Sequence, residues 1–332
     1  MRHTFFCIDG HTAGNPVRLV VGGAPLLHGN SMSERRQDFL ARFDWIRTGL
    51  MFEPRGHDLM SGGFLYPPTD ERADIGILFI ETSGCLPMCG HGTIGMVTFG
   101  LENGLIQPRQ LGRLSIETPA GLIQAEYSED GGRVTSVRLR NVASYLAAEG
   151  VKIDVPGLGP LTVDVAYGGN YYAIIEPQGG YTDLDSLGVA RLLELSPIVR
   201  RLMREAVEPV HPLDSTIRGV SHVLWADVPK AADADGRNAV FYGERAIDRS
   251  PCGTGTSARL AQLAAKGRLK VGERFVHESY IGSRFIGRVE ASIDLAGRAA
   301  IIPSIEGSAI STGTSTIWID QADPFWRGFQ VV

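Results

Sequence analysis

The sequence predicts an α/β fold built from two related halves, with mixed and mainly antiparallel sheets. Two observations predict the sheets: short apolar, β-branched runs recur along the chain, and 41 glycines and 18 prolines punctuate them. Such a pattern is typical of short strands joined by tight turns. A third observation predicts the two halves, because one short cysteine motif occurs twice, about half a chain apart.

The expected strands are the apolar and alternating runs between these turn residues. They cover residues 17–21, 75–81, 114–118, 134–139, 173–176, 223–225 and 239–242.

Four segments have helical spacing, and two of them follow the cysteine motifs. In the segment from Thr93 to about Glu102, apolar residues form one stripe, and Asn103-Gly104 supplies a stop signal. In the segment from about Thr256 to Lys266 the same stripe recurs, and Gly267 is a natural C-cap. Helices are also expected over 34–47 and 187–207.

Composition and charge exclude several classes of partner. The net charge of −5 disfavours nucleic acid and anionic membranes. No run of about eighteen apolar residues is available to span a membrane, and the N-terminus lacks the apolar region of a secretory signal. Four cysteines are too few for a disulfide scaffold and fit a reducing compartment. We therefore expect a cytoplasmic protein.

The repeated motif opens each time with a cysteine, followed by glycines and a helical pattern. Its two copies are Cys89-Gly90-His91-Gly92-Thr93-Ile94-Gly95 and Cys252-Gly253-Thr254-Gly255-Thr256-Ser257-Ala258. Each cysteine is thus expected at a helix N-terminus, where the helix dipole lowers a thiol pKa toward neutrality. The glycines let backbone N–H groups approach a carboxylate closely. Two thiols that face one site from two sides can move a proton from one face of a carbon to the other.

Other interpretations of the motif are weaker. Gly90–Gly95 matches a dinucleotide fingerprint, but the preceding strand is expected to end near Glu81, too far away for a nicotinamide-binding turn. A zinc site from Cys85, Cys89 and His91 would lack a second ligand pair. Oxidation of Cys89 with Cys252 is read as a vulnerability rather than a function. A protein that only binds amino acids would have no need of paired thiols.

At these residues the chain resembles the proline racemase family, and the resemblance runs nearly end to end. It lies in residues 10–20 (GHTAGNPVRLV), 54–62 (PRGHDLMSG), 83–95 (SGCLPMCGHGTIG), 166–174 (AYGGNYYAI), 237–243 (RNAVFYG), 248–258 (DRSPCGTGTSA) and 323–325 (DPF).

This resemblance implies the diaminopimelate-epimerase-like fold: two pseudo-symmetric lobes, each with a mixed, mainly antiparallel sheet around a central helix. The N-terminal lobe is expected over 1–122, joined by the C-terminal tail at about 320–332, and the C-terminal lobe over 123–319. The active site is expected in the cleft between the lobes, and the resemblance is compatible with a homodimer.

Within the family, the pattern is closest to the 4-hydroxyproline 2-epimerases. These cofactor-independent enzymes invert Cα of trans-4-hydroxy-L-proline to give cis-4-hydroxy-D-proline. A proline racemase is the nearest alternative, and an NAD-dependent dehydrogenase is a more remote one. Relatives that dehydrate trans-3-hydroxyproline carry threonine in place of the second cysteine, so Cys252 disfavours that chemistry. The expected partner is a small-molecule substrate, with neither cofactor nor metal.

The resemblance also assigns roles to individual residues. The catalytic pair is Cys89 and Cys252. The backbone amides of Gly90, His91, Gly253 and Thr254 bind the substrate carboxylate. The side chains of Asp248 and His91 hold the ring nitrogen of the substrate. His222, in a strand, also contacts the substrate. On its own, Asp248 could instead close the turn before Ser250-Pro251. Tyr242 lies where proline racemases carry a phenylalanine, so its hydroxyl could recognise a 4-hydroxy group or lie in an interface.

Overall fold

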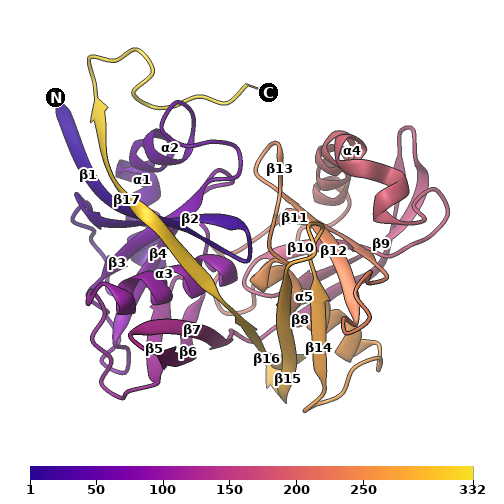
Figure 1. The fold of residues 1–332 in the computed structure, drawn as a ribbon. Helices are drawn as coiled ribbons and strands as arrows, with labels where there is room; N and C mark the ends of the chain where they lie inside the picture. The colour runs from indigo at the N-terminus through magenta and orange to yellow at the C-terminus, as the bar shows by residue number, and fades with distance from the viewer. Residues whose placement is uncertain (332) are drawn as a thin grey trace. The chain divides into compact units, whose positions relative to one another are not determined.

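The computed structural model describes residues 1–331 and has a mixed α/β fold of strands with few helices (Figure 1). The chain folds into two compact units. Unit 1 comprises Met1–Leu139 and the C-terminal segment that begins at Gly307, and unit 2 comprises Arg140–Glu306. The division therefore falls after Leu139 and Glu306, whereas the sequence analysis put it after residues 122 and 319.

The sheet of unit 1 is built from both ends of the chain. The neighbouring strands are, in spatial order, β17 (Ala309–Asp320), β1 (Arg2–Thr12), β2 (Asn15–Gly22), β3 (Ser61–Tyr66), β4 (Ile75–Glu81), β5 (Arg113–Thr118) and β6 (Gly121–Asp130). Along this order the pairings are antiparallel, antiparallel, parallel, antiparallel, parallel and antiparallel. A further strand, β7 (Arg133–Arg140), ends at the boundary of the unit.

Helices cover both faces of this sheet. Helix α3 (Gly90–Glu102) packs against β17, β1, β2 and β3, whereas α1 (Met32–Arg42) and α2 (Asp44–Met51) pack against β4. Side chains alternate between the two faces of a strand. A Cβ atom added at Gly63 of β3 would lie 2.9 Å from Met96 of α3. The next residue, Phe64, joins an apolar cluster that also contains Phe39 of α1. Helix α3 is therefore the central helix of unit 1.

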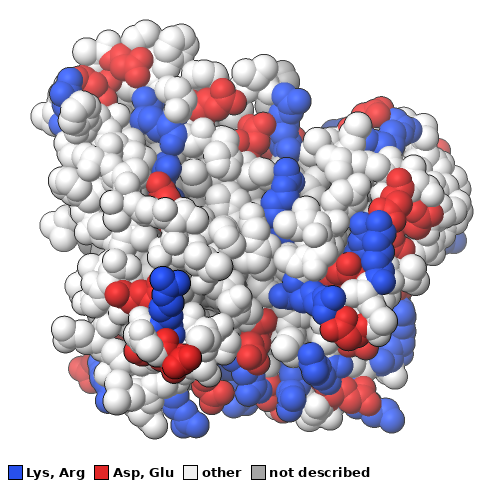
Figure 2. Space-filling model, viewed as in Figure 1, with Lys and Arg blue, Asp and Glu red and all other residues white. Residues whose placement is uncertain are grey.

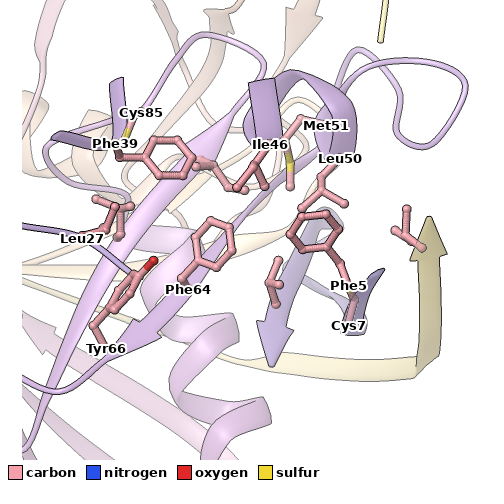
Figure 3. Close-up of a cluster of buried hydrophobic side chains, with 14 of the residues drawn as sticks. Phe5, Cys7, Leu27, Phe39, Ile46, Leu50, Met51, Phe64, Tyr66 and Cys85 are labelled. Atoms are coloured by element: carbon pink, nitrogen blue, oxygen red, sulfur yellow. The ribbon is translucent and has the colours of Figure 1, made fainter. Parts of the chain in front are cut away.

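The expected helix over 34–47 is two helices in the structure. Phe43 separates them with a non-helical backbone (φ −129°, ψ 8°), and its N–H bonds the carbonyl of Phe39. The break turns α2 so that Ile46 and Leu50 join the apolar cluster of unit 1. Figure 3 shows these side chains beside Phe39 and Phe64, with Cys85 at the edge of the cluster.

The sheet of unit 2 repeats the pairing pattern of unit 1. Its strands are, in spatial order, β8 (Tyr145–Val155), β9 (Gly159–Tyr167), β10 (Tyr171–Ile175), β11 (Val220–Asp227), β12 (Gly236–Tyr242), β14 (Arg274–Glu278), β15 (Arg284–Leu295) and β16 (Arg298–Gly307). From β8 to β15 the pairings are again antiparallel, antiparallel, parallel, antiparallel, parallel and antiparallel. The pseudo-symmetry expected from the repeated motif is thus present in the topology of the two units.

The helices of unit 2 occupy equivalent places in this topology. Helix α4 (Leu184–Ala206) lies between β10 and β11 in the chain, as α1 and α2 lie between β2 and β3. Helix α5 (Gly253–Ala265) follows β12 and the short strand β13 (Ala246–Ile247), and packs against β8, β9, β10 and β15. It is the counterpart of α3, which follows β4. All the expected strands and helical segments therefore have counterparts in the structure, with the helix division at Phe43 as the main difference.

The surface carries charges of both signs. On the face shown in Figure 2, basic and acidic side chains are interspersed rather than gathered by sign. Within residues 1–331, no helix combines the length and the apolar character that a membrane crossing requires.

Candidate active site

The two motif cysteines occupy the same position at the start of the two central helices. Cys89 is the N-cap of α3 and Cys252 is the N-cap of α5. Each thiol-bearing residue is only 5% exposed. Because the first N–H groups of a helix have no acceptor within the helix, a ligand anion beside either cysteine would meet backbone donors and the positive end of the dipole. The residues that open the two helices are Gly90 and His91 in α3, and Gly253 and Thr254 in α5.

The first half-site, which we call the Cys89 half-site, consists of Asn15, Ser61, Cys89 and His91. The imidazole of His91 lies beside the thiol, with Nδ1 3.6 Å and Nε2 4.0 Å from Cys89 Sγ. The amide nitrogen of Asn15 lies 3.0 Å from His91 Nε2, and Ser61 Oγ lies 3.9 Å from Cys89 Sγ. All four residues are buried. The thiol of Cys89 thus lies among buried polar side chains.

The backbone of this half-site is held from two directions. Thr93 donates both its N–H and its hydroxyl to the carbonyl of Cys89, at 2.9 and 2.7 Å. Thr12, from the end of β1, donates its hydroxyl to the carbonyl of His91 at 2.8 Å. A Cβ atom added at Gly92 would lie 2.9 Å from Cys89 Sγ. Only glycine therefore leaves the sulfur in its observed place.

The second half-site, the Cys252 half-site, consists of Asn170, Tyr172, His222, Asp248, Cys252 and Thr254. The hydroxyl of Tyr172 lies 3.3 Å from Cys252 Sγ and 2.5 Å from Thr254 Oγ1, and Thr254 Oγ1 lies 4.0 Å from the same sulfur. A Cβ atom added at Gly255 would lie 3.1 Å from that sulfur. Glycine three residues after the cysteine therefore serves the same steric purpose in both motifs.

Cys252 differs from Cys89 in its backbone. Its φ of 62° and ψ of 108° lie in a region that non-glycine residues rarely adopt, whereas Cys89 is extended with φ −141°. Such a conformation costs about 1–3 kcal/mol and persists only where the surroundings impose it. The hydroxyl of Ser250 accepts the N–H of Cys252 at 3.1 Å and fixes this backbone from before the helix.

The environment of Cys252 keeps the thiol protonated in the free protein. Burial raises the pKa of Cys252, and the nearby carboxylate of Asp248 raises it further. Hydrogen bonds with Tyr172, the N–H of Gly255 and Thr254 oppose this rise only in part. The sequence analysis expected the helix N-terminus to lower the thiol pKa toward neutrality, and for Cys252 that expectation was wrong, because desolvation outweighs the local donors.

Asp248 closes the turn that leads into the second motif. Its Oδ1 accepts both the N–H and the hydroxyl of Ser250 at 2.8 Å, and its own N–H bonds the carbonyl of Val240. The turn-closing role considered in the sequence analysis is therefore present. It does not exclude a role toward substrate, because the carboxylate is buried close to Cys252 and acts on its pKa.

His222 lies on β11 between two tyrosine rings. Its ring centroid is 4.7 Å from that of Tyr172 and 6.4 Å from that of Tyr242, and its Nδ1 lies 2.7 Å from the hydroxyl of Ser221. His222 therefore belongs to the Cys252 half-site through Tyr172. Tyr242 is only 2% exposed, so within this unit it is a buried residue next to His222.

The structure brings the predicted residues together in two groups, one in each unit. Their roles toward substrate stay predictions. Sequence reasoning did not single out four further residues that contact these groups, namely Asn15, Ser61, Asn170 and Tyr172. The two asparagines had a usable signal in the sequence. The dipeptide Gly-Asn occurs in two of the segments that carry the family resemblance, residues 10–20 and 166–174. Tyr172 had none beyond its presence in such a segment.

The alternative interpretations gain no support from this geometry. Strand β4 ends at Glu81 and α3 begins at Gly90, so the glycines do not form the direct strand-to-helix turn of a dinucleotide site. Cys85 lies in the apolar cluster of unit 1, and burial raises its pKa to about 12. Among residues 1–331, no group of three His, Cys, Asp or Glu side chains converges as metal ligands would.

Comparison with known proteins agrees with the resemblance seen in the sequence. The family model described as "Proline racemase" matches residues 7–330. A 4-hydroxyproline epimerase of Brucella ovis is 60% identical to this chain over 330 residues, which is 99% of both proteins. The crystal structure of a hydroxyproline epimerase from Agrobacterium vitis with bound trans-4-hydroxy-L-proline is 31% identical; it superposes with a TM-score of 0.92 and covers 99% of this chain and 95% of that one.

A more distant structure bears on the fold alone. The phenazine biosynthesis protein of the PhzF family from Bacillus anthracis is 16% identical, with a TM-score of 0.61 over 96% of this chain and 99% of that one. The fold class predicted from the sequence, diaminopimelate-epimerase-like, is thereby confirmed.

Proposed function

Because this chain belongs to the proline racemase family, we propose that it is a 4-hydroxyproline 2-epimerase. It interconverts trans-4-hydroxy-L-proline and cis-4-hydroxy-D-proline by moving a proton between one face of Cα and the other. The observation that carries the proposal is the pair of buried cysteines at equivalent helix N-termini of two units with the same strand pairing. The similarity to 4-hydroxyproline epimerases over nearly the whole chain supports the choice of substrate.

The reaction requires one base and one acid on opposite faces of the same carbon. In this proposal, the thiolate of Cys89 removes the α-proton from one face, and the thiol of Cys252 delivers a proton to the other face. The reverse reaction exchanges the roles of the two cysteines. Because each thiol can exist in both protonation states, the pair returns to its starting state only after a turnover in the opposite direction or after proton exchange with water.

The helix N-termini supply the stabilisation that this step needs. Removal of the α-proton moves negative charge onto the substrate carboxylate. N–H donors that already point at those oxygens stabilise this charge without reorganisation. We assign this role to the amides of Gly90 and His91 at α3, and of Gly253 and Thr254 at α5.

Asp248 and His222 act on the other end of the substrate in this proposal. The cationic ring nitrogen binds near the buried carboxylate of Asp248. His91, in the Cys89 half-site, is assigned a second contact with this nitrogen. A positive charge beside Cys252 also lowers the pKa of its thiol, against the effects of burial and of Asp248. Substrate binding thus makes accessible the thiolate state that the free half-site disfavours. His222 contacts the substrate from β11.

We further propose that the enzyme needs no cofactor and acts in the cytoplasm, in the catabolism of hydroxyproline. The paired thiols and the helix amides together supply the base, the acid and the charge stabilisation of the reaction. All four cysteines, Cys7, Cys85, Cys89 and Cys252, are buried. So small a number of cysteines suits a protein of a reducing compartment.

Proton NMR in D2O tests this function directly. The purified enzyme is incubated under reducing conditions with trans-4-hydroxy-L-proline and no added cofactor, and with L-proline in a parallel sample. We expect deuterium at Cα together with the signals of cis-4-hydroxy-D-proline. Faster turnover of L-proline would identify a proline racemase with the same chemistry. No exchange with either substrate would contradict the proposal.

Two matched variants test the two-thiol mechanism. Cys252→Ser and Cys89→Ser should each lower epimerisation by about a thousandfold or more, because one of the two faces loses its acid or base. In D2O, each variant should still exchange the Cα proton of one enantiomer, without inversion, and the two variants should prefer opposite enantiomers. Substantial epimerisation by either variant, or the same enantiomer preference in both, would refute the mechanism.

A further inference from the structure

The two hairpins that contact the motif helices share a feature outside the cysteine motifs. Gly14 lies in the turn between β1 and β2, and Asn15 follows it as the first residue of β2. Gly169 and Asn170 lie in the turn between β9 and β10. Both glycines adopt a positive φ, 92° at Gly14 and 111° at Gly169. The strands on either side are equivalent in the two units, because β1 and β2 occupy the places that β9 and β10 occupy in the pairing order. Asn15 and Asn170 are therefore equivalent residues.

Each of these asparagines contacts the residue two positions after a cysteine of the pair. The amide nitrogen of Asn15 lies 3.0 Å from His91 Nε2, and the amide nitrogen of Asn170 donates to Thr254 Oγ1 at 3.4 Å. Asn15 is 0% and Asn170 is 3% exposed. The same amide thus meets two different side chains, an imidazole in unit 1 and a hydroxyl in unit 2, and each of those side chains in turn faces a thiol.

We propose that Asn15 and Asn170 are positioning residues for the two thiols, and that Asn15 holds His91 in the neutral tautomer whose proton lies on Nδ1 and points toward Cys89 Sγ. This inference rests on the proposed function, because it assigns the two asparagines to the epimerisation. It concerns residues for which neither the sequence motif nor the family resemblance supplied a role.

The tautomer follows from the inventory of donors. An amide NH2 group donates hydrogen bonds and accepts none, so His91 Nε2 must carry a lone pair where it meets Asn15. A neutral imidazole with an unprotonated Nε2 carries its proton on Nδ1. Nδ1 is also the ring nitrogen closer to Cys89 Sγ, at 3.6 Å. The same contact disfavours the imidazolium ion, because a proton on Nε2 would point at the amide protons of Asn15.

The Cys252 half-site is arranged differently. Thr254 Oγ1 accepts from Asn170 and shares a 2.5 Å hydrogen bond with Tyr172, whose hydroxyl also reaches Cys252 Sγ. Hydroxyl groups donate and accept, so this chain can run in either direction. Tyr172 can donate to the thiolate of Cys252, or it can accept from the thiol and donate to Thr254. The amide of Asn170 satisfies Thr254 in both arrangements.

The two thiols therefore face different partners in the free enzyme. Cys89 faces the fixed donor of His91, with the Ser61 hydroxyl on β3 at 3.9 Å. Cys252 faces hydroxyl groups that can either donate or accept a hydrogen bond. The carboxylate of Asp248 is also close enough to disfavour the thiolate of Cys252. A fixed donor stabilises a thiolate. We therefore expect a thiolate to form more readily at Cys89 than at Cys252, which makes Cys89 the more accessible base in the free enzyme.

Nitrogen-15 NMR of the labelled, full-length enzyme tests the tautomer without turnover. The His91 signals are assigned by their loss in His91→Gln. In the wild type we expect a protonated shift for Nδ1 and an unprotonated shift for Nε2. In Asn15→Asp, a carboxylate replaces the donor by an acceptor, so Nε2 should become protonated. A protonated Nε2 in the wild type, or unchanged shifts in Asn15→Asp, would overturn the tautomer assignment.

Alkylation by iodoacetamide tests the positioning role at each thiol separately. Peptide mass spectrometry follows the modification of Cys89 and Cys252 between pH 6 and pH 10. In the wild type, Cys89 should react first at neutral pH. In Asn15→Ala, its rate at neutral pH should fall about tenfold, while that of Cys252 stays within about twofold. Asn170→Ala should slow Cys252 and leave Cys89 unchanged.

A purely structural role of the asparagines would give other results. It would slow or accelerate both thiols together, or would lower the melting temperature without changing the order of reaction, and either outcome would overturn the proposal. Both variants should also lower kcat/KM about equally in the two directions, because the equilibrium constant between the epimers is fixed. The NMR and alkylation results do not depend on catalysis. They can therefore fail while epimerisation is observed, or hold while it is not.

Discussion

At the scale of single residues, Cys252 shows how one position can carry opposing influences on a thiol. The start of a helix favours a thiolate through its dipole and its N–H groups. Burial and the carboxylate of Asp248 favour the thiol, and they outweigh those donors in the free protein. In the proposed function, the cationic nitrogen of the substrate supplies the positive charge that this half-site lacks. The reactive state of Cys252 would then depend on the presence of substrate.

Tyr172→Phe tests the hydroxyl that faces this thiol. It removes the contacts with Cys252 Sγ and Thr254 Oγ1 while it keeps the ring beside His222. We expect kcat/KM to fall about ten- to a hundredfold, because the thiolate loses a hydrogen bond of the kind that ionised groups make most strongly. The alkylation of Cys252 should also shift to higher pH, because this hydrogen bond lowers the pKa of the thiol.

Tyr171→Phe is the matched control for this prediction. It removes the neighbouring hydroxyl, which lies 2.7 Å from that of Tyr145 and contacts neither thiol. Its loss should lower the melting temperature and leave the alkylation profile of Cys252 unchanged. Equal losses of activity in the two variants would show that Tyr172 supports only the packing of β10.

The same scale shows what the sequence could predict about the site. The cysteines were predicted from a repeated motif whose chemistry depends on local spacing alone. Tyr172 and Ser61 were missed because their contacts with the thiols join residues far apart in the chain, 80 and 28 positions from the cysteines. Periodicity predicts which side of a strand is buried, but it does not predict which buried polar group meets a given sulfur.

At the scale of elements, the start of each motif helix depends on a hairpin packed against it. In unit 2, the turn after β9 lies against the first residues of α5. A Cβ atom added at Gly168 would lie 2.2 Å from the carbonyl oxygen of Thr254 and 2.5 Å from the N–H nitrogen of Ala258. These are backbone atoms of the helix and cannot rotate away. The hairpin and the helix N-terminus therefore form one rigid element around Cys252.

Gly168→Ala should displace this helix start. We expect a lower melting temperature, a loss of kcat/KM of about tenfold or more, and slower alkylation of Cys252. In the proposed function the amides at this helix start bind the substrate carboxylate, and a displaced helix would no longer hold them in place. Gly313→Ala on β17 is the control, since no heavy atom lies within 4 Å of its added Cβ and its φ is not positive. If the two variants behave alike, the close approach at Gly168 does not position the site.

Helix boundaries mark the limit of prediction at this scale. Both motif helices begin three residues earlier than expected, at Gly90 and at Gly253. The glycines there weaken any helical signal in the sequence. In the structure each helix is extended by bonds to the cysteine carbonyl, from Thr93 in α3 and from Thr256 in α5. The break at Phe43 was also missed, because neither glycine nor proline marks it in the sequence.

At the scale of the whole molecule, the two units share a topology although only the motif and the Gly-Asn turns are visibly repeated in the sequence. Unit 1 takes its outer strand, β17, from the other end of the chain, and this strand pairs with β1 along its whole length. Such pairing between distant segments leaves no local trace. The repeated motif therefore predicts two related halves, whereas the pairing of β17 with β1 has no signal in the sequence.

Three buried thiols link the stability of the whole molecule to pH. Burial raises the pKa of Cys7 and of Cys85 to about 12, from a value of 9.0 in the absence of structure, and it raises that of Cys252 as well. A group whose pKa is higher in the folded state binds its proton more tightly there. Its contribution to stability is complete below pH 9 and is lost as the pH rises toward the folded value. The free energy of unfolding should therefore decline above pH 9.

Urea unfolding of the wild type and of Cys85→Ala, at several pH values from 7.5 to 10.5, measures this contribution. The variant lacks one of the three thiols but keeps every tyrosine and lysine, so the difference between the two curves isolates Cys85. We expect the variant to be less stable at pH 7.5, because a side chain of the apolar cluster is shortened. Above pH 9 the gap should narrow, by up to about 1.4 kcal/mol per pH unit. Parallel curves across this range would mean that Cys85 titrates alike in the folded and unfolded chains, and that its burial does not couple stability to pH.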